Sequence, residues 1–402
     1  MQTHAVDSVE ERTIEHIEES RQDAVKEQIF TNYRLQLPDQ EVIGTLVVRE
    51  GKIADIQPGR VSLGQDGGGD YLLPGLIELH TDNLERCVSP RPGVRWPVDA
   101  AATHHDRDLA AAGITTVCDA VAVGDIDPTS LRITEFASMI GAIESKQAAG
   151  KLSVDHHLHL RCELAYETVP DIVAEYAEHP MLSLISLMDH TPGQRQFAKL
   201  DKFKEYYMGK HGVGADEMDE FIDNRLAAQR DYAVSSREAL VKIAQRHGLA
   251  MASHDDATAE HVQQAVAEGV TISEFPTTLA AAKEAHGHGL KVLMGAPNLV
   301  LGGSHSGNVS AMELAKLDLV DLISSDYVPH SLLLSVFIIV AQTGKPVFEA
   351  MRPVTMNPAM AIGLEGDRGS LEAGKRADLL TVHLDNNLPR LTGVFSKGNR
   401  IA

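Results

Sequence analysis

Acidic and imidazole side chains recur at the ends of short apolar runs between residues 72 and 330. Six of eight such runs end in side chains that bind metals or transfer protons. They are His80 and Asp82, Asp119, Glu163, Asp189 and His190, His254 and Asp255, and Asp326. A single histidine of this kind is usually a hydrogen-bonded core residue, whereas several in register along one chain indicate a shared site. Because imidazoles and carboxylates together suit zinc, manganese or iron(II), we expect one or two divalent metal ions.

Period-two alternation predicts which of these side chains share a strand face. In the run 156–164 the polar face consists of His157, His159, Arg161 and Glu163. In the first run one face is expected to hold Glu78, His80 and Asp82, and the other to hold Ile77, Leu79 and Thr81. A polar face on a buried strand is costly unless its groups are paired, hydrogen-bonded or bound to metal. The alternation therefore favours a metal site inside the fold over an all-structural explanation.

The predicted metal ligands are His80, Asp82, Glu163, His190, His254 and Asp326. Two ions about 3.5–4 Å apart would clamp the attacking and leaving oxygens of a hydrolytic displacement. Asp326 is the predicted general base for the attacking water, and His254 is the second predicted catalytic residue. Asn83 and Asp255 are expected to orient the ligands. For Asp255 a role as an acid at a helix N-terminus is the alternative.

The eight runs alternate with polar or alanine-rich helical stretches, which indicates parallel strands joined by crossover helices. Eight strands fit an α/β fold, a TIM-like (β/α)8 barrel over residues 74–364, with its active site at the C-terminal ends of the strands. A doubly wound sheet is the alternative. It needs a glycine-rich phosphate turn after its first strand, and residues 76–83 contain no glycine. A charged insertion at 192–234 is expected to be helical.

Segments rich in β-forming residues stand at both ends of the chain. Residues 28–73 and 365–402 are expected to form one small composite β-sandwich domain. Residues 1–27 hold eight acidic and three basic side chains. We expect them to form an acidic N-terminal extension, mobile or helical, with a partner-docking helix as the alternative.

The 402-residue chain carries 57 acidic and 36 basic side chains, a formal net charge of −21. Its 43% hydrophobic content excludes a disordered chain, and no apolar run is long enough for a membrane span. The acidity argues against a general nucleic-acid binder. Three cysteines without zinc-knuckle spacing, and a start without an export signal, predict reduced thiols in a cytoplasmic protein. An anionic substrate would require positive charge to be concentrated locally.

The order of the ligand series resembles the amidohydrolase superfamily. The gaps are 83 residues from His80 to Glu163, 27 to His190, 64 to His254 and 72 to Asp326. The lead-in at 73–80 and the Gly-Lys-Arg-Ala-Asp-Leu stretch at 374–379 are also similar to this superfamily. The superfamily places its Lys or Glu ligand on the fourth barrel strand, whereas Glu163 ends the third run. We therefore expect either an additional strand within 123–154 or a later run that lies outside the barrel.

Longer motifs narrow the resemblance to one branch, the diphosphatases of the carbon–phosphorus lyase pathway. The most specific are HTDN (80–83), HDDAT (254–258) and GGSHSGN (302–308). The resemblance implies hydrolysis of the α–β phosphoanhydride bond of α-D-ribose 1-methylphosphonate 5-triphosphate to the 5-phosphate and pyrophosphate. Two alternatives stay open. One is an amidohydrolase that acts on a C–N bond, such as a deaminase or cyclic amidase, and the other is a metal-free barrel that serves as an interaction scaffold.

A triphosphate substrate needs cations and hydrogen-bond donors around it. Arginines suit bidentate phosphate contacts, and a Gly/Ser loop offers backbone N–H groups. The predicted substrate-binding residues are Arg91, Arg95, Arg195, Ser304, His305 and Asn308. The predicted partners are this small phosphorylated ribosyl phosphonate and further copies of the chain in a homo-oligomer, with no nucleic acid and no membrane.

Overall fold

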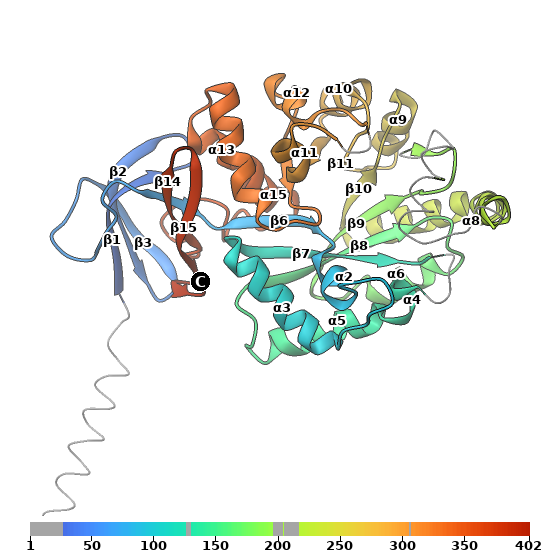
Figure 1. Cartoon of the computed structure of the whole chain (residues 1–402), viewed down its shortest axis with the longest axis horizontal. Helices are drawn as coiled ribbons and strands as arrows, with labels where there is room; N and C mark the ends of the chain where they lie inside the picture. Colours follow the sequence, from blue (N-terminus) through green and yellow to red (C-terminus); the bar gives the residue numbers. More distant parts are fainter. Residues whose placement is uncertain (1–26, 126–129, 196–203, 205–216, 305–306) are drawn as a thin grey trace, which may run out of the picture.

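The structure is a computed structural model that describes residues 27–125, 130–195, 204, 217–304 and 307–402. The predicted acidic extension, apart from Glu27, lies outside the described residues. Figure 1 shows a small sheet at one end of the molecule and a larger body of parallel strands surrounded by helices at the other. The chain starts its described part in the small sheet and returns to it at the C-terminus.

The larger body is a barrel of eight parallel strands that neighbour one another in chain order. They are β6 (Leu76–Thr81), β7 (Ile114–Val123), β8 (Asp155–Glu163), β9 (Leu182–Met188), β10 (Ala250–His254), β11 (Ile272–Glu274), β12 (Lys291–Gly295) and β13 (Leu322–Ser324). A parallel bridge between Thr81 and Asp326 joins the first strand to the last, so the barrel is nearly closed. The predicted barrel is confirmed, and the doubly wound alternative is wrong.

Each of the eight predicted runs supplies one barrel strand. Both expected explanations for the position of Glu163 are therefore wrong. Among the described residues between 123 and 154 there is no additional strand, and no later run leaves the barrel. Glu163 ends the third strand of the barrel.

Helices cover the outside of the barrel between successive strands (Figure 1). They include α2 (Asn83–Val88), α3 (Val98–Ala111), α4 (Leu131–Thr134), α5 (Phe136–Ala148), α6 (Val169–Tyr176), α8 (Met218–His247), α9 (Ala259–Ala267), α10 (Leu279–Gly287), α11 (Ala296–Leu301), α12 (Ala311–Lys316), α13 (Ser331–Thr343) and α14 (Val347–Met351). Residues 218–234 of the charged insertion are helical, as expected, and form the first part of the 30-residue α8.

Strand β8 alternates as the sequence predicts. Leu158, Leu160 and Cys162 belong to the core between the barrel and its helices, so the alternate face with His159, Arg161 and Glu163 lies toward the barrel interior. Strand β6 does not alternate, because its pairing with β7 shifts register between Glu78 and Thr81. Ile77 and Leu79 share a face as expected, but the expected separation of His80 from that face is wrong.

The β6 irregularity places both apolar and polar side chains inside the barrel. Ile77 and Leu79 belong to the apolar cluster in the interior, and the next residue, His80, contacts Glu274 across that interior. Glu78 accepts hydrogen bonds from the backbone N–H groups of His80, at 2.7 Å, and Ser325, at 2.6 Å. This buried carboxylate thereby fastens the first strand to the last.

The smaller sheet combines strands from both ends of the chain. Its order is β16 (Asn399–Arg400), β15 (Leu388–Ser396), β14 (Leu379–Asp385), β5 (Tyr71–Pro74), β1 (Glu27–Gln36), β2 (Glu41–Arg49) and β3 (Lys52–Pro58), with β4 (Gln65–Asp66) beside β1. Two strands separate β1 from β15, yet the rings of Phe30 and Phe395 pack edge to face with centroids 5.0 Å apart. This mainly antiparallel sheet therefore curls over one core, and a composite β unit from both termini is confirmed.

A single glycine connects strand β5 of the sheet to strand β6 of the barrel. Gly75 lies between β5 and β6, and a Cβ atom there would stand 2.2 Å from Thr115 Oγ1. Only glycine fits this approach without a shift of the neighbouring chain. The junction therefore fixes where the first barrel strand begins.

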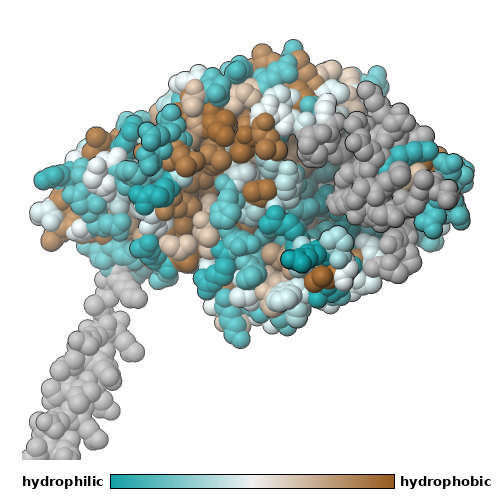
Figure 2. Space-filling model, in the orientation of Figure 1, coloured by the Kyte–Doolittle hydropathy of each residue, from teal (hydrophilic) through white to brown (hydrophobic). Residues whose placement is uncertain are grey.

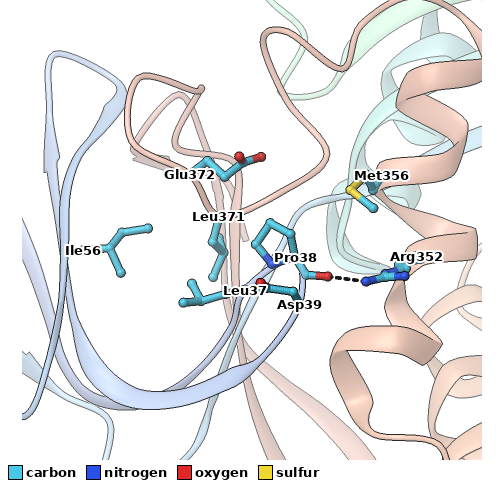
Figure 3. Close-up of a pocket in the computed structure, with 8 residues that line it drawn as sticks. All are labelled: Leu37, Pro38, Asp39, Ile56, Arg352, Met356, Leu371 and Glu372. Atoms are coloured by element: carbon cyan, nitrogen blue, oxygen red, sulfur yellow. Dashed lines mark hydrogen bonds between the residues drawn. The ribbon is translucent and has the colours of Figure 1, made fainter.

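A hollow of about 540 Å³ lies where the sheet meets η2 (Arg352–Val354) and α15 (Met356–Ala361), as Figure 3 shows. Its lining includes Leu37, Ile56 and Leu371, and Arg352 donates a 2.7 Å hydrogen bond to the Pro38 carbonyl. None of the predicted site residues lines it. The hollow is therefore separate from the predicted metal site.

Surface and membrane features are simple. Across the described part of the chain, no helix combines the length and apolar character that a bilayer crossing requires. On the face shown in Figure 2, hydrophobic residues gather around α13, between the small sheet and the barrel helices. Cys87, Cys118 and Cys162 are free thiols.

Candidate metal centre and active site

The predicted ligands meet at one end of the barrel because each stands at the C-terminal end of a strand. His80, Glu163 and His254 lie at the ends of β6, β8 and β10. Asp82, His190 and Asp326 follow β6, β9 and β13 within two residues. Parallel strands bring all their carboxyl ends to the same rim, which is where barrel enzymes build their sites.

Glu274, the last residue of β11, lies at the centre of this rim. Its two carboxylate oxygens each lie 2.6 Å from an imidazole, one from His80 Nδ1 and the other from His254 Nδ1. The two rings stack with centroids 5.9 Å apart. Although burial disfavours its charge, the neighbouring imidazoles of His80 and His159 hold the pKa of Glu274 well below its usual range.

The charge of Glu274 decides where the histidine protons lie. A carboxylate only accepts hydrogen bonds, so Nδ1 of His80 and of His254 must each carry a proton. Their Nε2 atoms are then free of protons when the rings are neutral. A carboxylate that orients a histidine in this way is the usual support of a metal-binding imidazole.

His159 offers another unprotonated nitrogen. Its Nδ1 donates a 2.9 Å hydrogen bond to the Leu79 carbonyl, and burial lowers its pKa to about 3, so the ring is neutral. Its Nε2 is buried and has no hydrogen-bond partner among the described residues. Ligand atoms of His80, His159 and Glu274 lie within 4.8 Å of one another. An orphaned imidazole nitrogen in this position fits a divalent metal.

A second group of candidate ligands adjoins the first. Glu163 Oε2 accepts a 2.7 Å hydrogen bond from His190 Nδ1, and the rings of His190 and His254 lie 5.4 Å apart. Ligand atoms of His190, His254 and Asp255 lie within 4.8 Å of one another. Burial opposes the charge of Glu163, but the His190 imidazole outweighs it and lowers the pKa of Glu163. Asp255, predicted to orient ligands, thus stands among them.

Asp326 and Asp82 face each other where the barrel closes. The Asp326 carbonyl accepts hydrogen bonds from Thr81 Oγ1, at 2.8 Å, and from the Asp82 N–H, at 3.2 Å. Burial, together with the Asp82 carboxylate, raises the pKa of Asp326 above its ordinary value. A carboxylate shifted in this direction is a better proton acceptor near neutral pH.

Three non-glycine residues at the rim have a left-handed backbone. They are Asp255 (φ +56°), Phe275 (φ +54°) and Asp326 (φ +55°), which follow β10, β11 and β13. Such a conformation costs about 1–3 kcal/mol at each position and concentrates at functional sites. The ring of Phe275 packs against His80 and His254, with centroids 4.9 and 5.7 Å away. The surrounding contacts therefore hold the strained residues at the metal centre.

The predicted anion-binding arginines occupy two different environments. Arg91 and Arg95 are exposed, and Arg95 donates a 2.8 Å hydrogen bond to Ser89 Oγ. Arg195 is buried, donates to the His254 carbonyl at 2.8 Å and pairs with Asp256. Arg195 therefore supports the end of β10, whereas Arg91 and Arg95 remain accessible to a ligand.

The Gly/Ser loop approaches the same rim. Ser304 and Asn308 are half-buried, and the Val309 N–H donates a 3.0 Å hydrogen bond to the carbonyl of Thr277, just beyond β11. The third predicted contact of this loop, His305, lies outside the described residues.

Asn83 is tied to a buried network behind the barrel wall. Its Nδ2 lies 3.1 Å from His105 Nδ1, and His105 Nε2 lies 2.6 Å from Asp119 Oδ1. The other Asp119 oxygen lies 2.7 Å from His156 Nδ1. Asp119, a strand-end acid in the sequence, therefore bonds to α3 and β8 outside the barrel interior and does not reach the rim.

Sequence reasoning missed two residues of this centre. The run at 271–278 holds one acid, Glu274, in its interior and ends in Thr278, so the sequence does not mark this acid as a strand end. His159 was placed on the polar face of its strand but not among the ligands. The signal was present for His159, which shares a strand face with the predicted ligand Glu163; for Glu274 the signal is a single acid in an otherwise uncharged run.

Comparison with known proteins gives a consistent result. The amidohydrolase family matches residues 71–402. The chain is 44% identical over 378 residues to the alpha-D-ribose 1-methylphosphonate 5-triphosphate diphosphatase of Escherichia coli (strain K12), an alignment that covers 93% of this chain and 100% of that protein.

Solved structures resemble the fold at low identity. N-acetylglucosamine-6-phosphate deacetylase from Pasteurella multocida aligns with a TM-score of 0.60 at 15% identity, covering 94% of this chain and 100% of that one. The 5-methylcytosine deaminase from Klebsiella pneumoniae aligns with a TM-score of 0.62 at 15% identity, covering 93% and 97%. At these identities the likeness concerns the fold alone.

Proposed function

Because the chain belongs to the amidohydrolase family, we propose that it hydrolyses the α–β phosphoanhydride bond of α-D-ribose 1-methylphosphonate 5-triphosphate. The products are the 5-phosphate and pyrophosphate. The observation that carries this proposal is the 44% identity to a diphosphatase of that substrate, over that protein's whole length. The imidazole-rich rim supports it, since phosphoanhydride hydrolysis is a reaction that metal sites of this kind perform.

The donor set fits a divalent cation. His80 and His254 are oriented through Nδ1 with Nε2 available, and His159 has an orphaned Nε2. Several imidazoles together favour zinc, manganese or iron(II) over magnesium or calcium. When bound, the cation lowers the pKa of a coordinated water and polarises a phosphoryl oxygen. The predicted ligands Asp82, Glu163, His190 and Asp326 complete the proposed site.

The side chains around the centre have distinct tasks. Glu274 holds two imidazoles in one tautomer, and Glu163 does the same for His190. Asp326 accepts the proton of the attacking water, a role that its raised pKa supports. Of the predicted phosphate contacts, Arg91, Arg95, Ser304, His305 and Asn308 bind the substrate directly. Arg195, the sixth, acts indirectly by supporting the end of β10 through the His254 carbonyl and Asp256.

The protein acts in the cytoplasm as a homo-oligomer.

Hydrolysis of a C–N bond is the less favoured reaction. The deaminase and deacetylase neighbours share only 15% identity with this chain, so they bear on its fold and not on its substrate. The full-length diphosphatase relative is far more similar.

Pyrophosphate release tests the proposal. The purified protein is stripped of metal, reloaded separately with zinc, manganese and iron(II), and incubated with the ribosyl triphosphate. We expect pyrophosphate and the 5-phosphate in equal amounts, resolved by phosphorus NMR. If none of the three loaded forms releases pyrophosphate while one of them hydrolyses an amide or nucleobase, the proposal is wrong.

A further inference from the structure

One buried arginine stands apart from the others in the described part of the chain. Arg161 lies on β8 between His159 and Glu163, on the inward face of the strand, and is 7% exposed. It forms no ion pair or hydrogen bond with any described residue, and its Nε is fully enclosed without a partner. The guanidinium is thus a buried positive charge without a direct ion pair or hydrogen bond to any described side chain.

The other buried arginines show what this chain normally does with such a charge. Each of them pairs with a carboxylate. Their partners are Asp256 for Arg195, Asp125 for Arg225, Glu268 for Arg237, and Asp155 for both Arg368 and Arg376. Arg161 is therefore the exception among the buried arginines that the structure describes.

An unpaired buried guanidinium is costly. Removing an ion from water costs several kcal/mol even in a relaxed protein interior, and a guanidinium cannot avoid this by losing its proton. A ligand anion would restore the missing partner. The free-energy cost of burying the unpaired Arg161 charge therefore indicates that an anion binds beside it in the active site.

The position of the charge indicates which anion. Electrostatic interactions connect Arg161 with His80 on β6, Asp255 after β10 and Asp326 after β13. The guanidinium thus faces the interior of the rim from β8, among candidate ligands from three other strands. Arg91 and Arg95, by contrast, are exposed in the loop after β6.

We propose that Arg161 binds the phosphoryl group under attack, with two parallel N–H donors on its non-bridging oxygens. This subsite rests on the proposed function, because it assumes that a phosphoryl group enters the rim. Planar guanidinium groups match phosphate oxygens in this geometry. No bond to Arg161 forms or breaks.

The chemical step places negative charge on those oxygens. The water oxygen bonds to phosphorus, its proton passes to Asp326, and the anhydride P–O bond breaks with its electron pair on the departing pyrophosphate. A fixed cation in a water-poor interior stabilises this charge without reorganising. Arg161 is therefore a substrate-binding and catalytic residue that the loop arginines do not replace.

A purely structural Arg161 would behave differently on replacement. A structural arginine loses stability when it becomes methionine, whereas removal of an unpaired buried charge leaves the melting temperature unchanged or raises it. Arg368 provides the matched control. It is 8% exposed and pairs with Asp155 at the opposite end of the same strand.

The test compares Arg161→Met, Arg161→Lys and Arg368→Met with the unaltered protein. Isothermal titration calorimetry measures the Kd for inorganic phosphate, a mimic of the attacked phosphoryl group, in metal-loaded and metal-free protein, and scanning calorimetry measures Tm. We expect Arg161→Met to weaken phosphate binding and to lower kcat/KM about 100-fold or more without a fall in Tm. Arg161→Lys keeps the positive charge but loses the two parallel N–H donors, so it should retain only part of the affinity for the anion. Arg368→Met should lower Tm and leave Kd unchanged.

The outcomes separate this inference from the proposed function. If the unaltered protein releases no pyrophosphate from the triphosphate but binds inorganic phosphate through Arg161, the proposed reaction is wrong and the anion subsite stands. If it releases pyrophosphate and Arg161→Met matches its Kd and kcat/KM, the subsite is wrong. A fall in Tm for Arg161→Met like that of Arg368→Met, with unaltered kinetics for Arg161→Lys, would also overturn it.

Discussion

Replacing Glu274 by glutamine should weaken metal binding through the histidines that this carboxylate orients. Its two oxygens accept protons from His80 Nδ1 and His254 Nδ1, each at 2.6 Å. A glutamine amide has one acceptor oxygen, and its NH2 group donates. One imidazole keeps its partner, while the other meets a donor and must move its proton to Nε2. That histidine then has no free electron pair to offer at Nε2.

The size of the effect follows from the count of lost contacts. Loss of one orienting partner of a metal-binding histidine typically costs 10–100-fold in affinity. One of the two histidines loses its orientation completely, so we expect the metal Kd of Glu274→Gln to rise about 10–100-fold, equivalent to about 1.4–2.8 kcal/mol.

Competition with a chromogenic chelator at fixed pH measures this Kd, and circular dichroism confirms that the variant is folded. Glu268→Gln is the control, because Glu268 pairs with Arg237 on the outer helices and contacts no candidate ligand. Its metal Kd should equal that of the unaltered protein. A Kd within threefold of the unaltered value for folded Glu274→Gln would refute the orienting role.

Three further predictions concern catalysis, the sheet–barrel junction and pH. Asp326→Asn should lower kcat about 10²–10⁴-fold with an unchanged circular dichroism spectrum, and a near-normal rate would remove Asp326 as the base. Gly75→Ala should lower the free energy of unfolding in urea by about 1–3 kcal/mol because of the Thr115 contact. Gly141→Ala, in open space on α5, should raise it by up to about 1 kcal/mol. Equal free energies of unfolding for the two variants would disprove the contact. Burial disfavours a charged His156, but Asp119 raises its pKa to about 9, above the ordinary 6.5. Its stabilising contribution is therefore complete below pH 6.5 and lost as pH rises through 9. The Tm should fall over this range, less steeply in His156→Gln, and parallel profiles would contradict the assignment.

The barrel could be predicted because its strands carry their own signal. Each run is short and apolar, ends in a polar residue and precedes a helix, so strand number and order follow from the chain alone. The irregularity of β6 could not be foreseen, since the residues beside it bond to distant parts of the chain: Glu78 bonds to Ser325, which is 247 residues away. Contacts of this kind depend on barrel closure and leave no local pattern.

The site was predictable in its location and less so in its connections. Histidines and acids at strand ends identified the rim, but the pairing of His80 with Glu274 spans 194 residues. Arg91 and Arg95 stand out in the sequence because they lie in a loop after the first strand. Arg161 is recognisable only as part of a polar strand face, and its lack of a described partner is revealed only by the folded chain.

The sheet built from both termini has a consequence for synthesis. Strand β5 pairs with β14 through Pro74 and Leu379, so 379 − 74 = 305 residues separate the two partners. At about 5–20 residues per second, the ribosome needs roughly 15–60 s to produce the second partner after the first. During that interval the edge of β5 that β14 will cover has no strand beside it, and such edges invite pairing with other chains. The nascent chain therefore exposes this edge of β5 to other chains until β14 has emerged.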